Sequence, residues 1–196
     1  MEYFAISDTH FLHDNIIKYC DRPQDHNRIM IKNWIKNVRD DDIVFHLGDV
    51  ACSVKNNKDK EHKLKEIFKI LPGKKFLIKG NHDTFSDEFY YELGFEKIDY
   101  FCYIENYSML LIHYPLRIGS HDKESTRNII HNAMDFVKEN NIKYIVHGHI
   151  HNYPDIDNRH FNVSVEALDY TPKRLCEIYE TLEKRTQDNS VCFLNY

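Results

Sequence analysis

Seven side chains in this sequence are of the types that hold divalent metal ions in proteins, and they occur in short groups. Each group follows a short apolar run, and the seven residues are Asp8, His10, Asp49, Asn81, His113, His149 and His151. They offer nitrogen and oxygen donors but no thiolate, which suits Mn, Fe, Co, Ni or Zn and argues against a structural zinc site. Seven donors exceed what one tetrahedral ion needs, so two ions bridged by one carboxylate would complete the count.

The spacing within these groups favours chelation. In extended backbone the side chains of residues i and i+2 point to the same side, so Asp8 and His10 could hold one ion together. The same argument applies to His149 and His151. A glycine directly before Asp49 would let the backbone turn sharply or approach a ligand closely, because it has no Cβ.

Short strands alternating with amphipathic helices must position these residues. Runs of apolar or β-branched residues predict strands over 3–6, 43–47, 76–78, 98–104, 109–112, 144–146 and 161–165. Apolar residues at helical spacing predict helices over 28–38, 64–71 and 129–137. Five of the strands end at donor groups, and the carboxyl ends of strands are where α/β sheets bind ligands. The alternation itself indicates an α/β or α+β sandwich.

The composition is typical of one globular domain, and we expect residues 1–196 to form it. Hydrophobic residues make up 42% of the chain, which excludes a disordered or fibrous protein. With 26 Lys and Arg against 31 Asp and Glu, the formal charge is −5. No basic stripe is concentrated enough for salt-driven binding to long nucleic acid, so small substrates are favoured.

The chain shows neither a membrane span nor a leader. No apolar run approaches the roughly 18 residues of a span, and the first residues lack a basic segment followed by an apolar one. We therefore expect a cytoplasmic protein without a membrane partner. The five cysteines are widely spaced and include no C-x-x-C pair, so we expect reduced thiols without a shared role.

Taken in order, the donor motifs resemble those of the calcineurin-like metallophosphoesterases across nearly the whole chain. They are Asp8-x-His10, Gly48-Asp49, Gly80-Asn81-His82-Asp83, His113 and Gly148-His149-x-His151. The stretches 8–17, with Arg22-Pro23, and 162–166 are similar to small phosphoesterases of bacteria and their phages. One departure is Leu12, where that subgroup usually has Gly. The resemblance implies a two-sheet β-sandwich flanked by helices, a four-layer fold with the site at the strand ends along one edge.

The resemblance also implies a role for each motif. One metal would be held by Asp8, His10, Asp49 and His151, and the other by Asp49, Asn81, His113 and His149. Two divalent ions about 3.5 to 4 Å apart generate hydroxide from a bridging water and hold the phosphate oxygens for in-line attack. Mn is the ion we favour, with Fe, Ni, Co or Zn as alternatives. His82 would be catalytic, acting on the developing charge or the leaving oxygen, with Asp83 orienting its ring.

Further polar residues near these motifs could contact substrate. A helix beginning near residue 14 would bring His13, Asn15 and Arg22 close to the first motif, where phosphate could bind. A capping and packing role for these three is the alternative. Arg117 and His121 follow the fourth motif in a loop and could reach substrate or remain solvated.

The residues and the resemblance together predict a binuclear metal-dependent phosphoric ester hydrolase. We expect a phosphodiesterase acting on small phosphodiesters, cyclic nucleotides and dinucleotides included, because family members without a capping domain often cleave such bonds. A phosphomonoesterase or a nuclease of the same family is the alternative among enzymes. A non-catalytic metal-binding scaffold is the alternative outside them, although the intact Asn81-His82-Asp83 motif counts against it. The oligomeric state, the natural substrate and the physiological metal stay open.

Overall fold

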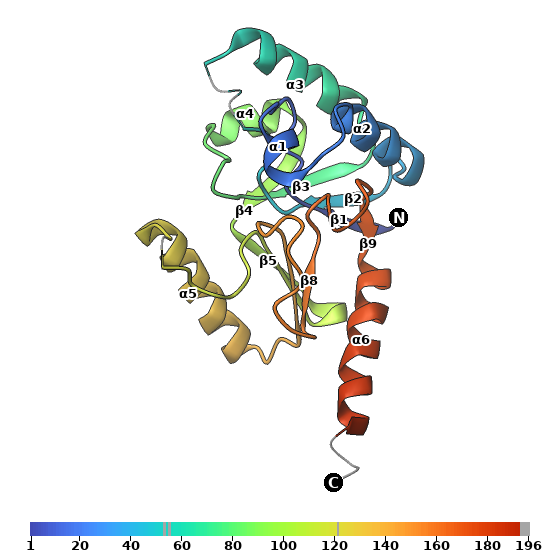
Figure 1. The fold of residues 1–196 in the computed structure, drawn as a ribbon, viewed down its shortest axis with the longest axis vertical. Helices are drawn as coiled ribbons and strands as arrows, with labels where there is room; N and C mark the ends of the chain where they lie inside the picture. The colour runs from blue at the N-terminus through green and yellow to red at the C-terminus, as the bar shows by residue number, and fades with distance from the viewer. Residues whose placement is uncertain (53, 55, 121, 193–196) are drawn as a thin grey trace.

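Two β-sheets lie against each other in the middle of the fold, and helices cover their outer faces (Figure 1). The computed structural model describes residues 1–52, 54, 56–120 and 122–192. Apolar side chains from both sheets fill the space between them, among them Ala5, Phe45, Leu111 and Val146. This mixed α/β arrangement confirms the predicted two-sheet sandwich flanked by helices.

The first sheet has the strand order β4-β3-β2-β1-β9, in which β1 to β4 run parallel and β9 pairs antiparallel with β1. Its strands are β1 (Tyr3–Ile6), β2 (Ile43–His46), β3 (Lys74–Ile78), β4 (Phe95–Asp99) and β9 (Lys173–Arg174). Because parallel strands share a direction, β1, β2 and β3 end at the same edge of the sheet. The loops that follow these three strands carry the first three donor groups.

The second sheet has the order β5-β6-β7-β8, with β6 to β8 parallel and β5 antiparallel to β6. Its strands are β5 (Phe101–Ile104), β6 (Met109–Ile112), β7 (Tyr144–His147) and β8 (His160–Asn162). Every residue of β6 and β7 is buried, as expected for parallel strands covered on both faces. After β8, Val163 and Val165 exchange backbone hydrogen bonds with Ser7 at the end of β1, at 2.8 and 3.1 Å. The two sheets are thus joined at the edge where the donor groups lie.

Helices pack on both outer faces of the sandwich. Trp34 and Phe68 anchor helices to the first sheet, Ala133 anchors one to the second, and Leu175 and Ile178 enter the space between the sheets. The helices labelled in Figure 1 are α1 (Ile16–Cys20), α2 (His26–Asn37), α3 (Lys58–Ile70), α4 (Asp87–Glu92), α5 (Glu124–Glu139) and α6 (Leu175–Cys192). A short 3₁₀ helix covers Glu105–Tyr107. None of the helices in the described part of the chain combines the length and apolar character that a membrane span needs.

The predicted strands and helices are present with two differences, and the structure adds α4, α6 and the two-residue strand β9. The run predicted as one strand over 98–104 is interrupted at Tyr100, and its halves join different sheets as β4 and β5. The strand predicted over 161–165 pairs with β7 only as far as Asn162. Helix α1 corresponds to the helix expected to begin near residue 14, whereas α4 has six residues, too few for a periodic pattern to be recognised. Helix α6 was missed although the apolar spacing of Leu175, Ile178 and Leu182 is helical.

The substitution Phe68→Ala tests how firmly α3 is packed on the first sheet. The buried ring of Phe68 lies against Phe11 and Phe95, with centroid separations of 5.9 and 5.3 Å. Its removal leaves a cavity, so we expect the free energy of unfolding to fall by about 3–5 kcal/mol in chemical denaturation. Ile70→Ala, at an exposed position of the same helix, should change it by less than about 0.5 kcal/mol. Equal effects of the two substitutions would contradict this packing.

Candidate metal centre

The carboxylate of Asp49 lies within reach of two groups of donor atoms at the edge where the strands end. Its Oδ2 is 3.5 Å from His10 Nε2 and 3.6 Å from His113 Nε2. The carboxylate and both imidazoles are buried. This is the position that a carboxylate shared by two ions would need.

The first donor group surrounds Asp8. Its Oδ1 is 4.0 Å from His10 Nε2 and 3.9 Å from His151 Nε2. The rings of His10 and His151 stack with a centroid separation of 5.3 Å. Donor atoms about 2.1 Å from one shared ion lie about 3 to 4 Å from one another, so the spacing suits a single ion.

The second donor group surrounds His113. Its Nε2 is 3.3 Å from Asn81 Oδ1 and 3.2 Å from His149 Nδ1. Asp49 completes both groups through Oδ2. The structure therefore brings together all seven side chains that the sequence singled out as donors.

Five of the seven donors stand in left-handed backbone. Their φ angles are +58° at Asp8, +44° at His10, +55° at Asp49, +71° at His149 and +51° at His151. The expectation that the i, i+2 pairs converge through extended backbone is therefore wrong, because both members of each pair sit in left-handed turns. Asp and His enter this region more readily than most residues, and strain of about 1–3 kcal/mol per residue is characteristic of functional sites.

Two glycines allow neighbouring loops to meet at the donors. Gly48 has a φ of +91°, and a Cβ there would lie 2.8 Å from His113 Nδ1. A Cβ at Gly148 would lie 2.3 Å from Asp8 Oδ2. A side chain at either position would displace a donor, and the left-handed φ of Gly48 confirms the sharp turn predicted there.

Hydrogen bonds behind two imidazole rings turn their Nε2 atoms toward the carboxylates. His113 Nδ1 donates to the carbonyl of Leu47 at 2.6 Å, and His151 Nδ1 donates to Glu166 Oε1 at 3.0 Å. With Nδ1 as the donor, Nε2 is the ring nitrogen that faces the carboxylates. Histidines that bind metals are commonly held in this way, since the outer hydrogen bond fixes both tautomer and ring orientation.

A buried ion pair supports the His151 side of the site. Arg22 Nη2 lies 2.7 Å from Glu166 Oε1, with side chains 0% and 5% exposed. The guanidinium also donates to the carbonyls of Asp8 and Thr9, at 2.6 and 2.8 Å. Arg22 thus lies beneath the first motif with its donors directed at the protein, which corrects the expectation that it contacts substrate. Glu166 is a positioning residue that the donor motifs alone did not reveal.

Burial shifts the pKa values of the donors. It raises the pKa of Asp49 to about 7. The nearby charges of Asp8 and Asp83 raise this pKa further, whereas His113 lowers it. Burial also lowers the pKa of His10 to about 2 and that of His149 to about 4. These imidazoles are therefore neutral at pH 7, which is the form that binds metals. A divalent cation would offset the cost of a buried carboxylate.

Several buried donor atoms have no hydrogen-bond partner within the described residues. They include Asp8 Oδ1 and both ring nitrogens of His10. Buried polar atoms nearly always have a partner, so these atoms need an ion or another polar group beside them. Two divalent ions fit this donor set. Asp8, His10, Asp49 and His151 could hold one ion, and Asp49, Asn81, His113 and His149 the other.

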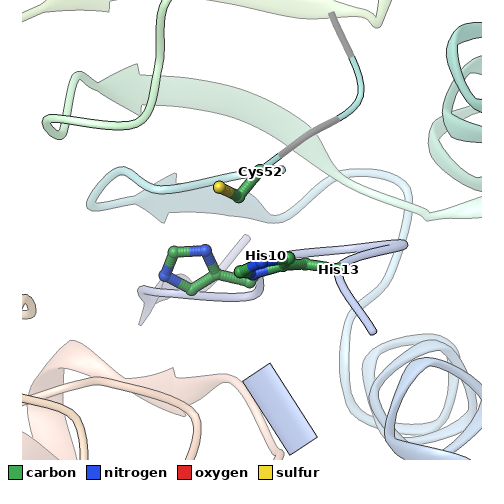
Figure 2. A group of neighbouring side chains, drawn as sticks. All are labelled: His10, His13 and Cys52. Atoms are coloured by element: carbon green, nitrogen blue, oxygen red, sulfur yellow. The ribbon is translucent and has the colours of Figure 1, made fainter. Parts of the chain in front are cut away.

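His82 lies at the surface next to the first donor group. Its ring centroid is 5.4 Å from that of His10, and its Nδ1 is 3.6 Å from Cys52 Sγ. His10, His13 and Cys52 also bring their own donor atoms within 4.8 Å of one another (Figure 2). Cys20 lies close to His151 and Glu166, so two cysteines border the site, which their spacing in the sequence did not indicate.

Asp83 holds the loops after β2 and β3 together instead of orienting the His82 ring. Its carboxylate accepts hydrogen bonds from the backbone N–H groups of Asp49 at 2.7 Å, Val50 at 3.0 Å and Gly80 at 2.8 Å. The hydroxyl of Tyr90 donates to it as well, at 3.2 Å. We therefore revise its expected role from ring orientation to the support of the Asp49 loop.

Two pockets flank the donor groups. The His151-side pocket has a volume of about 530 Å³ and is lined by residues that include His10, His82, His151, Tyr19 and Tyr153. The His149-side pocket has a volume of about 510 Å³ and is lined by residues that include Tyr114, Arg117, His149, Tyr153 and Ile156. Together they give a substrate access from two sides.

Of the other residues expected near substrate, some line one of the two pockets and others do not. His13 lines the His151-side pocket and Arg117 the His149-side pocket, whereas the exposed Asn15 lines neither. His121 lies outside the described residues. Leu12 adopts a left-handed φ of +62° and packs against the core of the first sheet, so a glycine would suit its backbone and its side chain does not line either pocket.

Residues 1–166 match the family model described as the calcineurin-like phosphoesterase superfamily domain. Because the match covers most of the sequence, the chain belongs to the calcineurin-like phosphoesterase superfamily. Members of this superfamily are generally metal-dependent phosphoesterases, and the donor cluster of the structure agrees with that property. The resemblance seen in the sequence motifs is thus confirmed.

Proteins from three organisms are similar to this chain in sequence or in structure. An uncharacterized protein of Methanocaldococcus jannaschii is 38% identical over 192 residues, which cover 92% of this chain and 91% of that protein. A protein of unknown function from Aquifex aeolicus matches the structure with a TM-score of 0.72 and 27% identity, over 91% of this chain and 98% of that one. A nuclease of Pseudomonas putida matches with a TM-score of 0.47 and 16% identity, over 76% of this chain and 61% of that one.

Glu166→Gln tests whether the buried ion pair supports metal binding. The amide keeps the shape of the side chain but removes the charge that Arg22 and His151 face. We expect Mn²⁺ affinity, measured by competition with a fluorescent chelator, to fall by about 10- to 100-fold. Glu139→Gln, at an exposed position at the end of α5, should leave it unchanged. Unaltered affinity in Glu166→Gln would show that Glu166 does not position His151.

Proposed function

We propose that this protein is a metal-dependent phosphodiesterase that hydrolyses small phosphodiesters, with residues 1–196 acting as one domain. The observation that carries the proposal is the placement of Asp49 Oδ2, 3.5 Å from His10 Nε2 and 3.6 Å from His113 Nε2. A carboxylate in that position can be shared by two ions. The family to which the chain belongs supports the same chemistry.

The proposed ligands are nitrogen and oxygen donors, for which Mn²⁺ is our first choice and Fe, Ni, Co or Zn are alternatives. When bound, two such ions supply an acidified water as nucleophile and neutralise charge on the phosphate oxygens. The protein contributes the geometry. His10 and His149 are neutral and Asp8 is ionised, while the hydrogen bonds behind His113 and His151 keep their Nε2 atoms directed at the two proposed ion positions.

We assign His82 the role of donating a hydrogen bond to the leaving oxygen of the substrate. Burial lowers the pKa of its imidazole, with His113 adding to the effect, so the ring is neutral at pH 7. Its backbone N–H donates to Asp49 Oδ1 at 2.9 Å, which ties its position to that of the shared carboxylate. Because the ring lines the His151-side pocket, one of its nitrogens can offer a hydrogen bond to charge that develops on a departing group.

Small substrates are favoured by charge and by size. The formal charge of −5 gives little attraction for a polyanion. The two pockets, of about 510 and 530 Å³, lie within the range of about 300–1,000 Å³ that small ligands occupy. The preference for diesters over monoesters and the cytoplasmic location remain predictions.

Metal add-back tests the proposed function. The purified protein is stripped of metal, Mn²⁺, Ni²⁺, Zn²⁺, Fe²⁺ and Mg²⁺ are added separately, and hydrolysis of bis-p-nitrophenyl phosphate is compared with that of p-nitrophenyl phosphate. We expect no turnover without metal, and with Mn²⁺ a kcat/KM for the diester that exceeds that for the monoester by more than about tenfold. The reverse preference would make the protein a monoesterase. Metal binding without hydrolysis across a broad phosphoester panel would favour a scaffold.

His82→Ala separates metal binding from turnover. We expect the variant to keep its metal content, measured by elemental analysis, and to lose about 10²- to 10⁴-fold in kcat on the diester. The reason is that no proposed ligand is removed, while the hydrogen bond to the leaving oxygen is lost. His131→Ala, at an exposed position on α5, serves as the matched histidine control. An unchanged kcat would remove His82 from the mechanism.

A further inference from the structure

We infer that the substrate is a phosphodiester with a ring-bearing group on each ester arm, and that Tyr153 determines the preference for it. This inference rests on the proposed function and specifies its substrate class. The observation behind it is that the two pockets beside the donor groups share Tyr153 in their linings.

Each pocket borders a different donor group. His10 and His151, of the first group, line the His151-side pocket, and His149, of the second group, lines the His149-side pocket. A phosphorus held between the two groups sends its ester oxygens in different directions because it is tetrahedral. A monoester would fill one of these pockets, whereas a diester can place one arm in each. Their similar volumes, about 510 and 530 Å³, suit two arms of comparable size.

Tyr153 is presented between the pockets by an anchored turn. Its backbone N–H donates to the carbonyl of Ile150 at 2.9 Å, and the buried Asn162 donates to the carbonyls of Tyr153 and His151, at 3.3 and 2.7 Å. The turn is therefore fixed to the same backbone that carries a proposed ligand. The residue is nonetheless 72% exposed, so its ring is available to a ligand on either side.

Aromatic rings line both pockets. Tyr19, itself 73% exposed, lines the His151-side pocket, and Tyr114 lines the His149-side pocket. The Tyr114 ring packs on His149 with a centroid separation of 5.2 Å, which fixes it next to the second donor group. Planar rings such as nucleobases stack on aromatic side chains, and the stacking tolerates different bases. Because Tyr114 is only 4% exposed, the ring face open to an arm in the His149-side pocket is that of Tyr153, whereas the His151-side pocket offers the rings of both Tyr19 and Tyr153.

The charges of the His149-side pocket favour an uncharged arm. Arg117 is the cation of its lining, and two carboxylates, Asp122 and Asp155, accompany it. Asp155 is itself paired with Arg185 at 2.7 Å. This pocket has no surplus of positive charge with which to hold a further phosphate group. A nucleoside-like arm fits these conditions better than the continuation of a polynucleotide.

Three esters with the same leaving group test the inference. They are bis-p-nitrophenyl phosphate, methyl p-nitrophenyl phosphate and p-nitrophenyl phosphate, assayed with the Mn²⁺-loaded protein. The first two are diesters of equal charge that differ in the second arm, so the ratio of their kcat/KM values reports that arm. Comparing this ratio between wild type and variant cancels the difference in intrinsic reactivity.

We expect Tyr153→Ala to lower the ratio by about tenfold or more, mainly through a higher KM for the bis-aryl ester. Tyr153→Phe should keep it, because the ring remains. Tyr19→Ala should lower kcat/KM for both diesters alike and leave the ratio unchanged, because Tyr19 shares its pocket with His82, where the common p-nitrophenyl leaving group lies. Tyr91→Ala removes an exposed tyrosine from α4 and should leave the ratio unchanged. Metal content and melting temperature, measured for every variant, show whether each is folded.

The outcomes separate this inference from the proposed function. If the wild-type protein hydrolyses the esters but Tyr153→Ala changes both diesters equally, or neither, the inference is overturned and the phosphodiesterase proposal stands. If Tyr153→Ala is unfolded, Tyr153→Leu, which keeps an apolar side chain but removes the planar ring, decides in the same way. If the wild-type protein hydrolyses none of the three esters with any added metal, the proposed function is overturned, and the inference with it.

Discussion

The buried carboxylate of Asp49 constrains everything around it. It lies in contact range of His10 and His113, and burial raises its pKa to about 7, so its charged form is unfavourable without compensation. The surrounding backbone holds it there nevertheless. The Asp83 carboxylate accepts a hydrogen bond from the backbone N–H of Asp49, and the backbone N–H of His82 donates one to Asp49 Oδ1. A site that fixes an unfavourable charge so firmly is suited to cations, whose binding would offset the cost of burying the carboxylate.

The parallel topology brings the other donors to that carboxylate. Strands β1 to β3 and β6 to β7 end along one edge, and the backbone pairing of Ser7 with Val163 and Val165 joins the sheets there. Left-handed turns then direct the individual side chains, as at His149 and His151. The Arg22–Glu166 ion pair beneath them shows that part of the polar interior serves orientation, because its contacts go to the first motif and to His151.

The sequence predicts the site better than it predicts how the site is held. Apolar runs followed by Asp, Asn or His identified the strand ends, because hydrophobic periodicity and ligand chemistry are local properties. The left-handed backbone of Asp8 and His10 was not predictable in this way, since the turn depends on the loops packed against it. The contacts of Asp83 and Arg22 were not predicted for a related reason. Most of them are hydrogen bonds to backbone groups, and the pattern of side-chain types in a sequence does not show which backbone groups will lie nearby. Tyr153 stood out only once two pockets were seen to share it.

Anomalous scattering from crystals grown with MnCl₂ would locate the bound ions without reference to activity. We expect two peaks about 3.5 to 4 Å apart, both bound by Asp49, one beside His10 and His151 and the other beside His113 and His149. A single peak, or peaks that do not share Asp49 as a ligand, would contradict this expectation. A peak confined to His10, His13 and Cys52 would contradict it as well, and would move the metal chemistry to the side of the site that carries a thiol.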